Sequence, residues 1–252
     1  MILPRTPSFR LDGRRALVTG AGRGIGLAAA ALAQAGAHVT LAARSAREIG
    51  EAAAAIRAEG GLADPLPLDV TDLHAVTLLA DASPFDILVN NAGTNRSKSI
   101  GEVSEADYDA VLGLNLKAAV FVAQALAAGL VRAGRPGSLI HMGSQMGHVG
   151  LAGRTLYCAS KWGLEGFSKA LALDLAPHGI RSNIIAPTFV ETPLTAPMLA
   201  DPAFRTSVLA RIKLGRLGRV EDLMGAVVYL ASDASALVTG TSLLVDGGWT
   251  AE

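Results

Sequence analysis

The chain has little charge, few aromatic residues and one cysteine. Of its 252 residues, 17% are charged and 4% are aromatic, and 22 basic residues balance 22 acidic ones. This balance favours neither nucleic acid nor an anionic membrane as a partner. Cys158 has no second cysteine with which to form an internal disulfide, which predicts a reducing, cytoplasmic location. The five histidines lack paired metal-ligand spacing, so no metal site is expected.

The sequence also lacks a hydrophobic run long enough to span a membrane. The longest candidate, Ala118–Val131, has 14 residues and contains Gln124, whereas a spanning helix needs about 20 residues. The N-terminal segment MILPRTPSFRLDGRR has two prolines and four arginines and no apolar stretch typical of a secretory signal. Half of all residues are nevertheless apolar, so much of the chain must be buried in a folded core.

Short β-branched runs alternate with stretches rich in alanine and leucine along the whole chain. This alternation predicts an α/β fold: one domain over residues 1–252, with a doubly wound parallel sheet of about seven strands and helices on both faces. The expected strands are Arg15–Thr19, His38–Ala42, Pro65–Val70, Ile87–Asn90, Ser138–Met142, Arg181–Ile185 and Ser242–Val245. The expected helices are Ile25–Gln34, Ala46–Glu59, Leu73–Ala80, Ala106–Arg132, Thr155–Ala176 and Val220–Ala231.

Two prolines bear on the order of the strands. Pro65 and Pro67 lie two positions apart, so their missing N–H donors face the same side of a strand. In a doubly wound sheet ordered 3-2-1-4-5-6 the third strand lies at an edge, where that side needs no donors. The prolines therefore favour this order, and a loop across the stretch is the alternative.

A glycine-rich turn joins the first expected strand to the first expected helix. Its sequence is Thr19-Gly20-Ala21-Gly22-Arg23-Gly24-Ile25-Gly26, with the spacing T-G-x-x-x-G-x-G rather than G-x-G-x-x-G. Glycines in such a turn let backbone N–H groups and a helix N-terminus approach a pyrophosphate. The turn therefore predicts a dinucleotide site formed by Gly20, Arg23, Gly24, Ile25 and Gly26.

Further motifs follow in order along the chain. They are Asp69-Val70, Asn90-Asn91-Ala92-Gly93, Asn115, Ser144, Tyr157-Cys158-Ala159-Ser160-Lys161 and Val245-Asp246-Gly247-Gly248. With the glycine turn they extend over nearly the whole chain, which resembles the classical short-chain dehydrogenase/reductase family. The resemblance implies a Rossmann fold, an adenine contact from Asp69, and cofactor walls at Asn90–Gly93 and at the turn after Pro187. The further cofactor contacts expected on this basis are Val70, Asn91, Ala92, Gly93, Tyr157, Lys161, Pro187, Thr188 and Thr192.

The second expected strand bears on which nicotinamide cofactor binds. Enzymes that use NAD place an acidic residue about 20 positions after the glycines, on the ribose 2′-hydroxyl, whereas an arginine there accommodates a 2′-phosphate. Here Ala43 stands at the acidic position and Arg44 follows it, and Arg23 offers a second cation. NADP(H) is therefore favoured. NAD(H) stays possible, with Arg44 stacked on the adenine.

Tyr157 and Lys161 form the only Tyr-x-x-x-Lys pair in the chain. With three tyrosines and five lysines, only about 0.06 such pairs are expected by chance. Positions i and i+4 share one helix face, so the ammonium lies near the phenol. A nearby cation is expected to lower the tyrosine pKa from about 10 toward working pH. Tyr157 is therefore the predicted acid/base for hydride transfer between an alcohol and a ketone.

Two more residues complete the expected catalytic set. Ser144 lies just beyond the fifth expected strand, at the carboxyl end of the sheet, where its hydroxyl can hold the substrate oxygen against Tyr157. Asn115 is unusual inside a long helix. Packing or capping would explain it alone, but the resemblance implies that it binds a water that links Lys161 to solvent. It also implies that Lys161 holds the nicotinamide ribose.

The expected substrate pocket lies between two segments. One is 145–154, and the other is 188–213, whose prolines and apolar helical face are typical of a lid, a covering helix pair or an oligomer contact. The family often has glycine after the proline of the sixth strand, where this chain has Thr188. The expected substrate contacts are Ser144, Gln145, His148, Arg154, Tyr157 and Thr188. Such polar walls suit a hydroxylated or carboxylated small molecule.

The sequence thus predicts an NAD(P)(H)-dependent oxidoreductase acting on a small polyol, sugar or sugar acid. A 3-oxoacyl carrier-protein reductase and a non-catalytic dinucleotide sensor are the alternatives, and the complete catalytic set argues against the sensor. The helices expected at Ala106–Arg132 and Thr155–Ala176 are apolar around much of their circumference. We therefore expect a homotetramer in which both helices and the last strand are covered by other subunits, with a dimer as the fallback.

Overall fold

A computed structural model of the chain describes residues 1, 3–81 and 84–251. Its seven strands are β1 (Arg15–Thr19), β2 (His38–Ala43), β3 (Leu62–Pro67), β4 (Ile87–Asn90), β5 (Gly137–Met142), β6 (Ile180–Pro187) and β7 (Ser242–Val245). They form one parallel sheet in the order β3-β2-β1-β4-β5-β6-β7. The expected doubly wound α/β fold and its strand order are confirmed.

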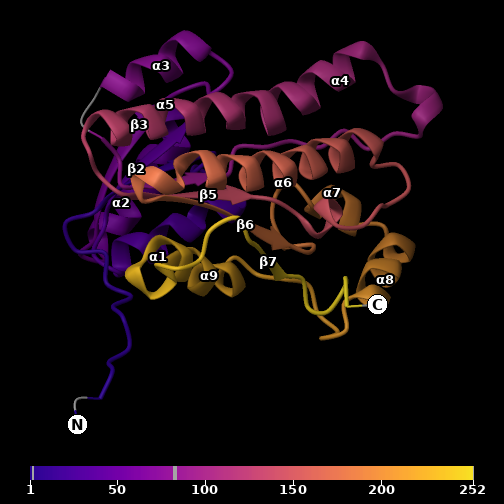
Figure 1. Ribbon diagram of the computed structural model, residues 1–252. Helices are drawn as coiled ribbons and strands as arrows, with labels where there is room; N and C mark the ends of the chain where they lie inside the picture. Colours follow the sequence, from indigo (N-terminus) through magenta and orange to yellow (C-terminus); the bar gives the residue numbers. More distant parts are fainter. Residues whose placement is uncertain (2, 82–83, 252) are drawn as a thin grey trace.

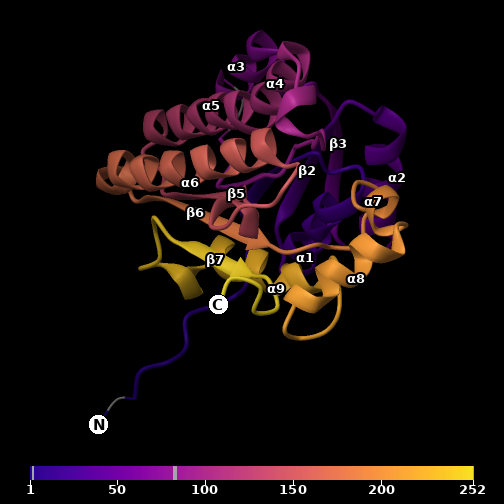
Figure 2. The same cartoon turned by 90° about the vertical axis from the view of Figure 1, so that its right-hand side faces the viewer.

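Helices cover both faces of this sheet (Figure 1). The α-helices are α1 (Ala29–Gln34), α2 (Ala46–Ala58), α3 (Leu73–Asp81), α4 (Glu105–Leu112), α5 (Ala119–Arg132), α6 (Thr155–Leu175), α7 (Ala196–Leu199), α8 (Pro202–Arg211) and α9 (Glu221–Ala231). Buried side chains of α1, α2 and α9 form a core against one face, and those of α3, α5 and α6 form a second core against the other. Figure 2 faces the end of the molecule where α7 and α8 lie.

The third strand begins and ends three residues earlier than the expected Pro65–Val70. It pairs with β2 from His38↔Leu62 to Ala43↔Pro67, and lies at the sheet edge that the two prolines favoured. Asp69 ends the strand, because its Oδ1 accepts hydrogen bonds from the backbone N–H and the hydroxyl of Thr71. Asp69 and Val70 therefore lie beyond the carboxyl end of β3 rather than within it.

Two expected helices contain a change of helix type. The turn after β1 continues as a 3₁₀ segment, Gly24–Ala28, before α1 begins, so the α-helical part of the expected Ile25–Gln34 is shorter. The expected Ala106–Arg132 helix is interrupted at Gly113–Ala118 by a π-helical segment between α4 and α5. A π segment adds one residue to a turn and is frequent at functional sites. Here it contains Asn115.

The combined helix from Glu105 to Arg132 is long and apolar enough, by length and composition, to cross a membrane. Half of its most apolar window is buried inside the fold, and a core helix of a soluble protein passes the same test. The exposed half is the part that a monomer leaves uncovered.

Candidate active site

A cavity of about 700 Å³ lies along the carboxyl ends of the parallel strands. Residues that follow β1, β2, β3, β4, β5 and β6 all contribute to its wall, as expected for a doubly wound sheet. The structure brings most of the predicted site residues together here. Those that line the cavity are Gly20, Arg23, Gly24, Ile25, Arg44, Asp69, Val70, Asn91, Ala92, Gly93, Ser144, Gln145, Arg154, Tyr157, Lys161, Pro187, Thr188 and Thr192.

The glycine turn forms one end of the cavity. Gly20 has φ +63°, and a Cβ there would lie 2.9 Å from the Cα of Ala92, so only glycine lets the two loops approach. Asn91 fixes this approach by donating from Nδ2 to the carbonyl oxygens of Thr19 and Gly20. Gly26 does not line the cavity: a Cβ on it would collide with the Gly20 carbonyl beneath the turn. Its role in the structure is close packing.

Cations gather at the wall after β2. Arg44 lines the cavity, and its charge helps Thr71 to hold the pKa of Asp69 below its ordinary value. Arg23 is mostly exposed and lies 3.5 Å from Glu48. Ser45, which we did not predict as a site residue, also lines the cavity and caps α2 by accepting from the Glu48 N–H. Its Ser-x-x-Glu pattern was the available signal, and the first turn of α2 borders the cavity through Ser45 and Glu48.

Tyr157 and Lys161 lie on the first turns of α6, and both line the cavity. The Lys161 Nζ lies 5.5 Å from the centre of the Tyr157 ring and donates to the carbonyl of Met142 at 2.7 Å. Burial lowers the pKa of Lys161 to about 8, although the charge of Glu165 opposes the shift. The expected direction for Tyr157 is wrong: burial raises its pKa, and this outweighs the lowering by a hydrogen bond with Ser144 and by the charge of Arg154.

Ser144 links the fifth strand to the catalytic helix. It caps a short 3₁₀ turn at Gln145–Gly147 by accepting from the Met146 N–H at 3.1 Å. Its hydroxyl donates to Gln145 Oε1 at 2.8 Å and is hydrogen-bonded with Tyr157. The cap fixes the backbone that carries this hydroxyl, and Ser144 and Tyr157 line the same cavity.

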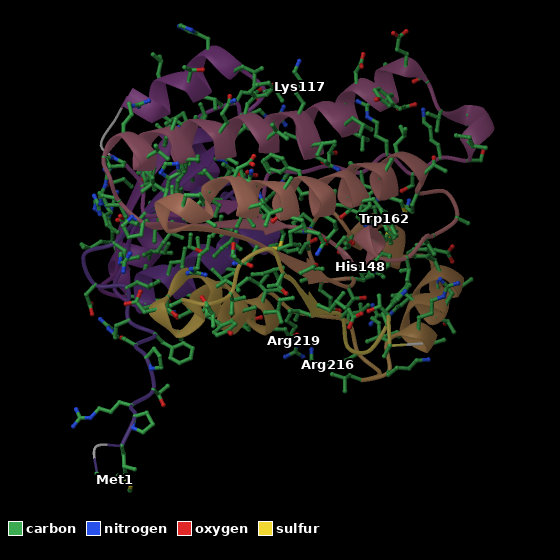
Figure 3. The ribbon with its side chains drawn as sticks, in the orientation of Figure 1. Met1, Lys117, His148, Trp162, Arg216 and Arg219 are labelled. Carbon is green, nitrogen blue, oxygen red and sulfur yellow. The ribbon has the colours of Figure 1, made fainter. Side chains whose placement is uncertain are left out.

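Asn115 lies behind the cavity wall rather than on it. Its Oδ1 accepts from the Thr94 N–H at 2.8 Å, and its Nδ2 donates to the Thr94 carbonyl and to the Ser160 hydroxyl. The π-helical turn directs this amide inward, whereas Lys117, two residues later, points away from the fold (Figure 3). Asn115 therefore ties the loop after β4 to the catalytic helix, and its expected role in holding a water stays a prediction.

His148 is the substrate contact that the structure does not bring to the cavity. It lies beneath α6 (Figure 3), where its Nε2 is 2.9 Å from the Ser242 hydroxyl and 3.1 Å from Glu165 Oε1. Glu165 is buried and also accepts from Ser242 at 2.9 Å. The structure therefore does not bring His148 together with the other expected substrate contacts, because its ring is bound to Ser242 of β7 and to Glu165.

Three buried polar side-chain atoms lack a hydrogen-bond partner in the described part of the chain. They are Asn95 Oδ1, Arg154 Nε and Thr188 Oγ1, and all three residues line this one cavity. Unsatisfied buried polar atoms are costly, and these three are grouped around one cavity. Asn95 was not predicted, since nothing in its sequence neighbourhood distinguishes it from a loop asparagine.

No group of three or more histidine, cysteine or acidic side chains that could hold a metal ion occurs among the described residues.

Comparison with known proteins gives one family model and a consistent set of relatives to which this chain is similar. The model described as enoyl-(acyl carrier protein) reductase matches residues 20–250. Gluconate 5-dehydrogenase of Gluconobacter oxydans is 40% identical over 248 residues, with 96% of each chain covered. L-xylulose reductase of Bos taurus is 38% identical, over 96% of this chain and 99% of its own length.

Solved structures agree with these sequence relatives. A gluconate 5-dehydrogenase from Burkholderia cenocepacia, crystallised with NADP and tartrate, superposes with a TM-score of 0.92 at 38% identity. The superposition covers 97% of this chain and 98% of that one.

Proposed function

The chain belongs to the classical short-chain dehydrogenase/reductase family, and from this premise we propose that it is an NADP(H)-dependent oxidoreductase of a small polyol, sugar or sugar acid. The observation that carries the substrate class is the set of three unpartnered polar atoms, Asn95 Oδ1, Arg154 Nε and Thr188 Oγ1, in the cavity that holds Tyr157. A substrate with several hydroxyl groups satisfies such a set, whereas an aliphatic substrate leaves it unsatisfied. The names of two relatives, gluconate 5-dehydrogenase and L-xylulose reductase, refer to compounds of this class.

The residues present fit a dinucleotide with a 2′-phosphate. Gly20 and Gly24 have positive φ and both line the cavity, and glycines in such a turn let backbone N–H groups approach a pyrophosphate. At the adenosine end Arg44 lines the cavity beside Ala43, where an enzyme specific for NAD has a carboxylate. NADP is the cofactor in the similar Burkholderia structure.

The mechanism follows from the positions of four side chains. The bound cofactor supplies hydride transfer to or from the substrate carbon. Tyr157 gives a proton to the ketone oxygen in reduction and takes one from the hydroxyl in oxidation. Burial raises the pKa of the phenol, which favours its protonated form. Ser144 holds the reacting oxygen, and Lys161 supplies the ammonium that binds the ribose.

Asn115 acts through its neighbours in this proposal. Its amide joins Thr94, on the cofactor loop, to Ser160, which accepts from Nδ2 and itself donates to the Tyr157 carbonyl at 2.7 Å. The side chain therefore fixes the distance between the cofactor loop and the catalytic helix. A water held at this point would connect Lys161 with solvent.

Segment 188–213 is proposed as the substrate lid of a single-domain enzyme. It contains α7 and α8, and its apolar side chains Phe189, Leu199, Val208 and Ile212 form a small core together with Met146, Leu217 and Trp249, apart from the two sheet cores. Met198 and Thr192 of this segment line the cavity, so the segment is one wall of the substrate site.

A cytoplasmic homotetramer is proposed from the uncovered apolar surface. Tyr108 on α4 is 54% exposed, Trp162 on α6 is 54% exposed and Leu173 on α6 is 78% exposed. Leu244 on the edge strand β7 is also exposed. Isologous contacts along both helices and the β7 edge bury these groups in a closed assembly. The single cysteine supports a reducing compartment.

A substrate screen tests the proposed activity. Absorbance at the nicotinamide band is followed with NADP⁺ and NAD⁺ and with polyols, sugars and sugar acids of four to six carbons. We expect oxidation of at least one compound, with a higher kcat/KM for NADP⁺. Turnover of a 3-oxoacyl thioester and of no sugar-like compound would contradict the proposal.

A further inference from the structure

Arg154 is a buried cation at the substrate end of the cavity. It immediately precedes α6, lies three residues before Tyr157, and is 6% exposed. Its contacts come from the proposed lid: Nη2 donates to the Met198 sulfur at 2.7 Å, and the guanidinium lies 5.8 Å from the centre of the Phe204 ring. The Nε–H group has no partner.

The described residues provide no carboxylate for this cation. No aspartate or glutamate among them forms an ion pair with Arg154, and burial lowers its pKa. Only Tyr157 and Cys158 raise the pKa of Arg154, and they do so through their deprotonated, negatively charged forms. When protonated, both groups are uncharged and do not balance the guanidinium. The acidic residues of the cavity wall, Glu48 and Asp69, lie at the adenosine end, beside Arg23 and Arg44.

A buried guanidinium without an anion is costly, and a thioether sulfur is a weak acceptor that does not neutralise it. The planar group has donors in a fork that matches a carboxylate. Here the Nε–H has no protein partner but its nitrogen is covered, and the Nη2–H has only the Met198 sulfur. A carboxylate that displaces the Met198 side chain can take both donors. A hydroxyl group supplies no charge and leaves the cation uncompensated.

We propose that Arg154 binds the carboxylate of the substrate and so restricts this chain to sugar acids, in preference to neutral sugars and polyols. The inference rests on the proposed function and narrows its substrate class. Arg154 and Tyr157 both line the cavity, and the charge of Arg154 acts on the Tyr157 phenol, so a carboxylate on Arg154 and a reacting hydroxyl on Tyr157 can belong to one small molecule. Thr188 and Asn95, whose side-chain oxygens have no partner, would hydrogen-bond hydroxyl groups of the same substrate molecule.

The test compares substrates that differ only at this group. D-gluconate and D-sorbitol, with shorter pairs of aldonic acid and alditol, are assayed with NADP⁺ for the wild type and for Arg154→Leu and Arg154→Lys. Arg219→Leu is the matched control, because Arg219 is an exposed cation outside the cavity, at the lower edge of the molecule in Figure 3. Binding of tartrate to the NADPH complex is measured in parallel by NADPH fluorescence.

We expect the wild type to prefer acids, and Arg154→Leu to lose about 100-fold or more in kcat/KM for acids. Its kcat/KM for alditols falls by less, so the ratio of kcat/KM for acids to kcat/KM for alditols drops. Arg154→Lys retains part of the preference for acids over alditols, and Arg219→Leu retains all of it. Tartrate affinity is expected to be highest in the wild type and Arg219→Leu, lower in Arg154→Lys and lowest in Arg154→Leu. Equal use of alditols by the wild type, or an unchanged preference in Arg154→Leu, overturns this inference and leaves the proposed function standing. No turnover of any acid or alditol by the wild type overturns the proposed function, and this inference with it.

Discussion

Replacing Lys161 by methionine is expected to stabilise the fold while it abolishes turnover. Burial lowers the Lys161 pKa from 10.5 to about 8, and a shift of this size corresponds to about 3 kcal/mol of unfavourable free energy for the charged form. Methionine removes that cost. It also removes the hydrogen bond to the Met142 carbonyl, which costs about 1 kcal/mol. The net expectation at pH 7 is a free energy of unfolding higher by about 2 kcal/mol.

The pH dependence of this difference follows from the lowered pKa. Between pH 8 and 10.5 the folded state holds Lys161 neutral while the unfolded state still binds a proton. The wild type therefore gains stability as pH rises through this window, and the cost present in full below pH 8 is progressively lost. From pH 7 to pH 9.5 the gap between variant and wild type narrows by about 2 kcal/mol.

Equilibrium unfolding in urea at pH 7 and pH 9.5, at one protein concentration, measures both quantities. Lys169→Met is the control, because Lys169 lies on the same helix but is exposed, and it should show no such dependence. A variant less stable than the wild type at pH 7, with a gap that does not change with pH, would refute the reasoning.

Three other predictions concern the cofactor, the core and the assembly. Ala43→Asp combined with Arg44→Leu should reverse a preference for NADP⁺ of about 10- to 100-fold into a preference for NAD⁺ in kcat/KM; a wild type that already prefers NAD⁺ would exclude the role of Arg44. Asp86→Ala should lower the free energy of unfolding by about 2–3 kcal/mol, because this buried carboxylate accepts from the Arg15 N–H at 2.8 Å and pairs with Arg135; urea unfolding that matches the wild type would contradict this. Light scattering should give about four times the chain mass of 25.8 kDa, and a monomer mass would show that the exposed faces of α4 and α6 stay uncovered.

Much of the fold could be predicted because helices and strands have periodic apolar patterns in the sequence and because prolines restrict where a strand can lie. Helical and strand patterns alternate along the chain, and Pro65 and Pro67 can be accommodated only where a strand side has no neighbour, which is the observed edge. The ends of β3 were predicted three residues too late, because the sequence pattern includes Asp69 in the strand. In the structure the Asp69 carboxylate accepts from Thr71 in the turn that follows β3. A turn of this kind depends on the hydrogen bonds of one side chain. It therefore does not change the periodic pattern of apolar residues from which strands are predicted.

The site was predicted less completely for a different reason. Tyr157, Lys161 and Ser144 carry their spacing in the sequence, and the structure places them together. The π-helical turn around Asn115 leaves the apolar pattern of a long helix almost unchanged, so the sequence cannot reveal it. Burial raises the pKa of Tyr157 and outweighs the lowering by Ser144 and by the charge of Arg154, and the sequence does not show how deeply the phenol is buried. His148 is near Tyr157 in sequence, but its side chain is bound to Ser242 and Glu165.

The central claim is that Tyr157 transfers the proton when a sugar-like alcohol and its ketone are interconverted with NADP(H). Its most direct test is steady-state turnover of wild type and Tyr157→Phe on the best substrate of the screen, with NADPH binding measured on the same samples by fluorescence. The account predicts less than about 1% of wild-type kcat in the variant, with the dissociation constant for NADPH within about 3-fold, because phenylalanine removes only the proton-transfer group. A variant that retains more than a tenth of wild-type activity would contradict the account.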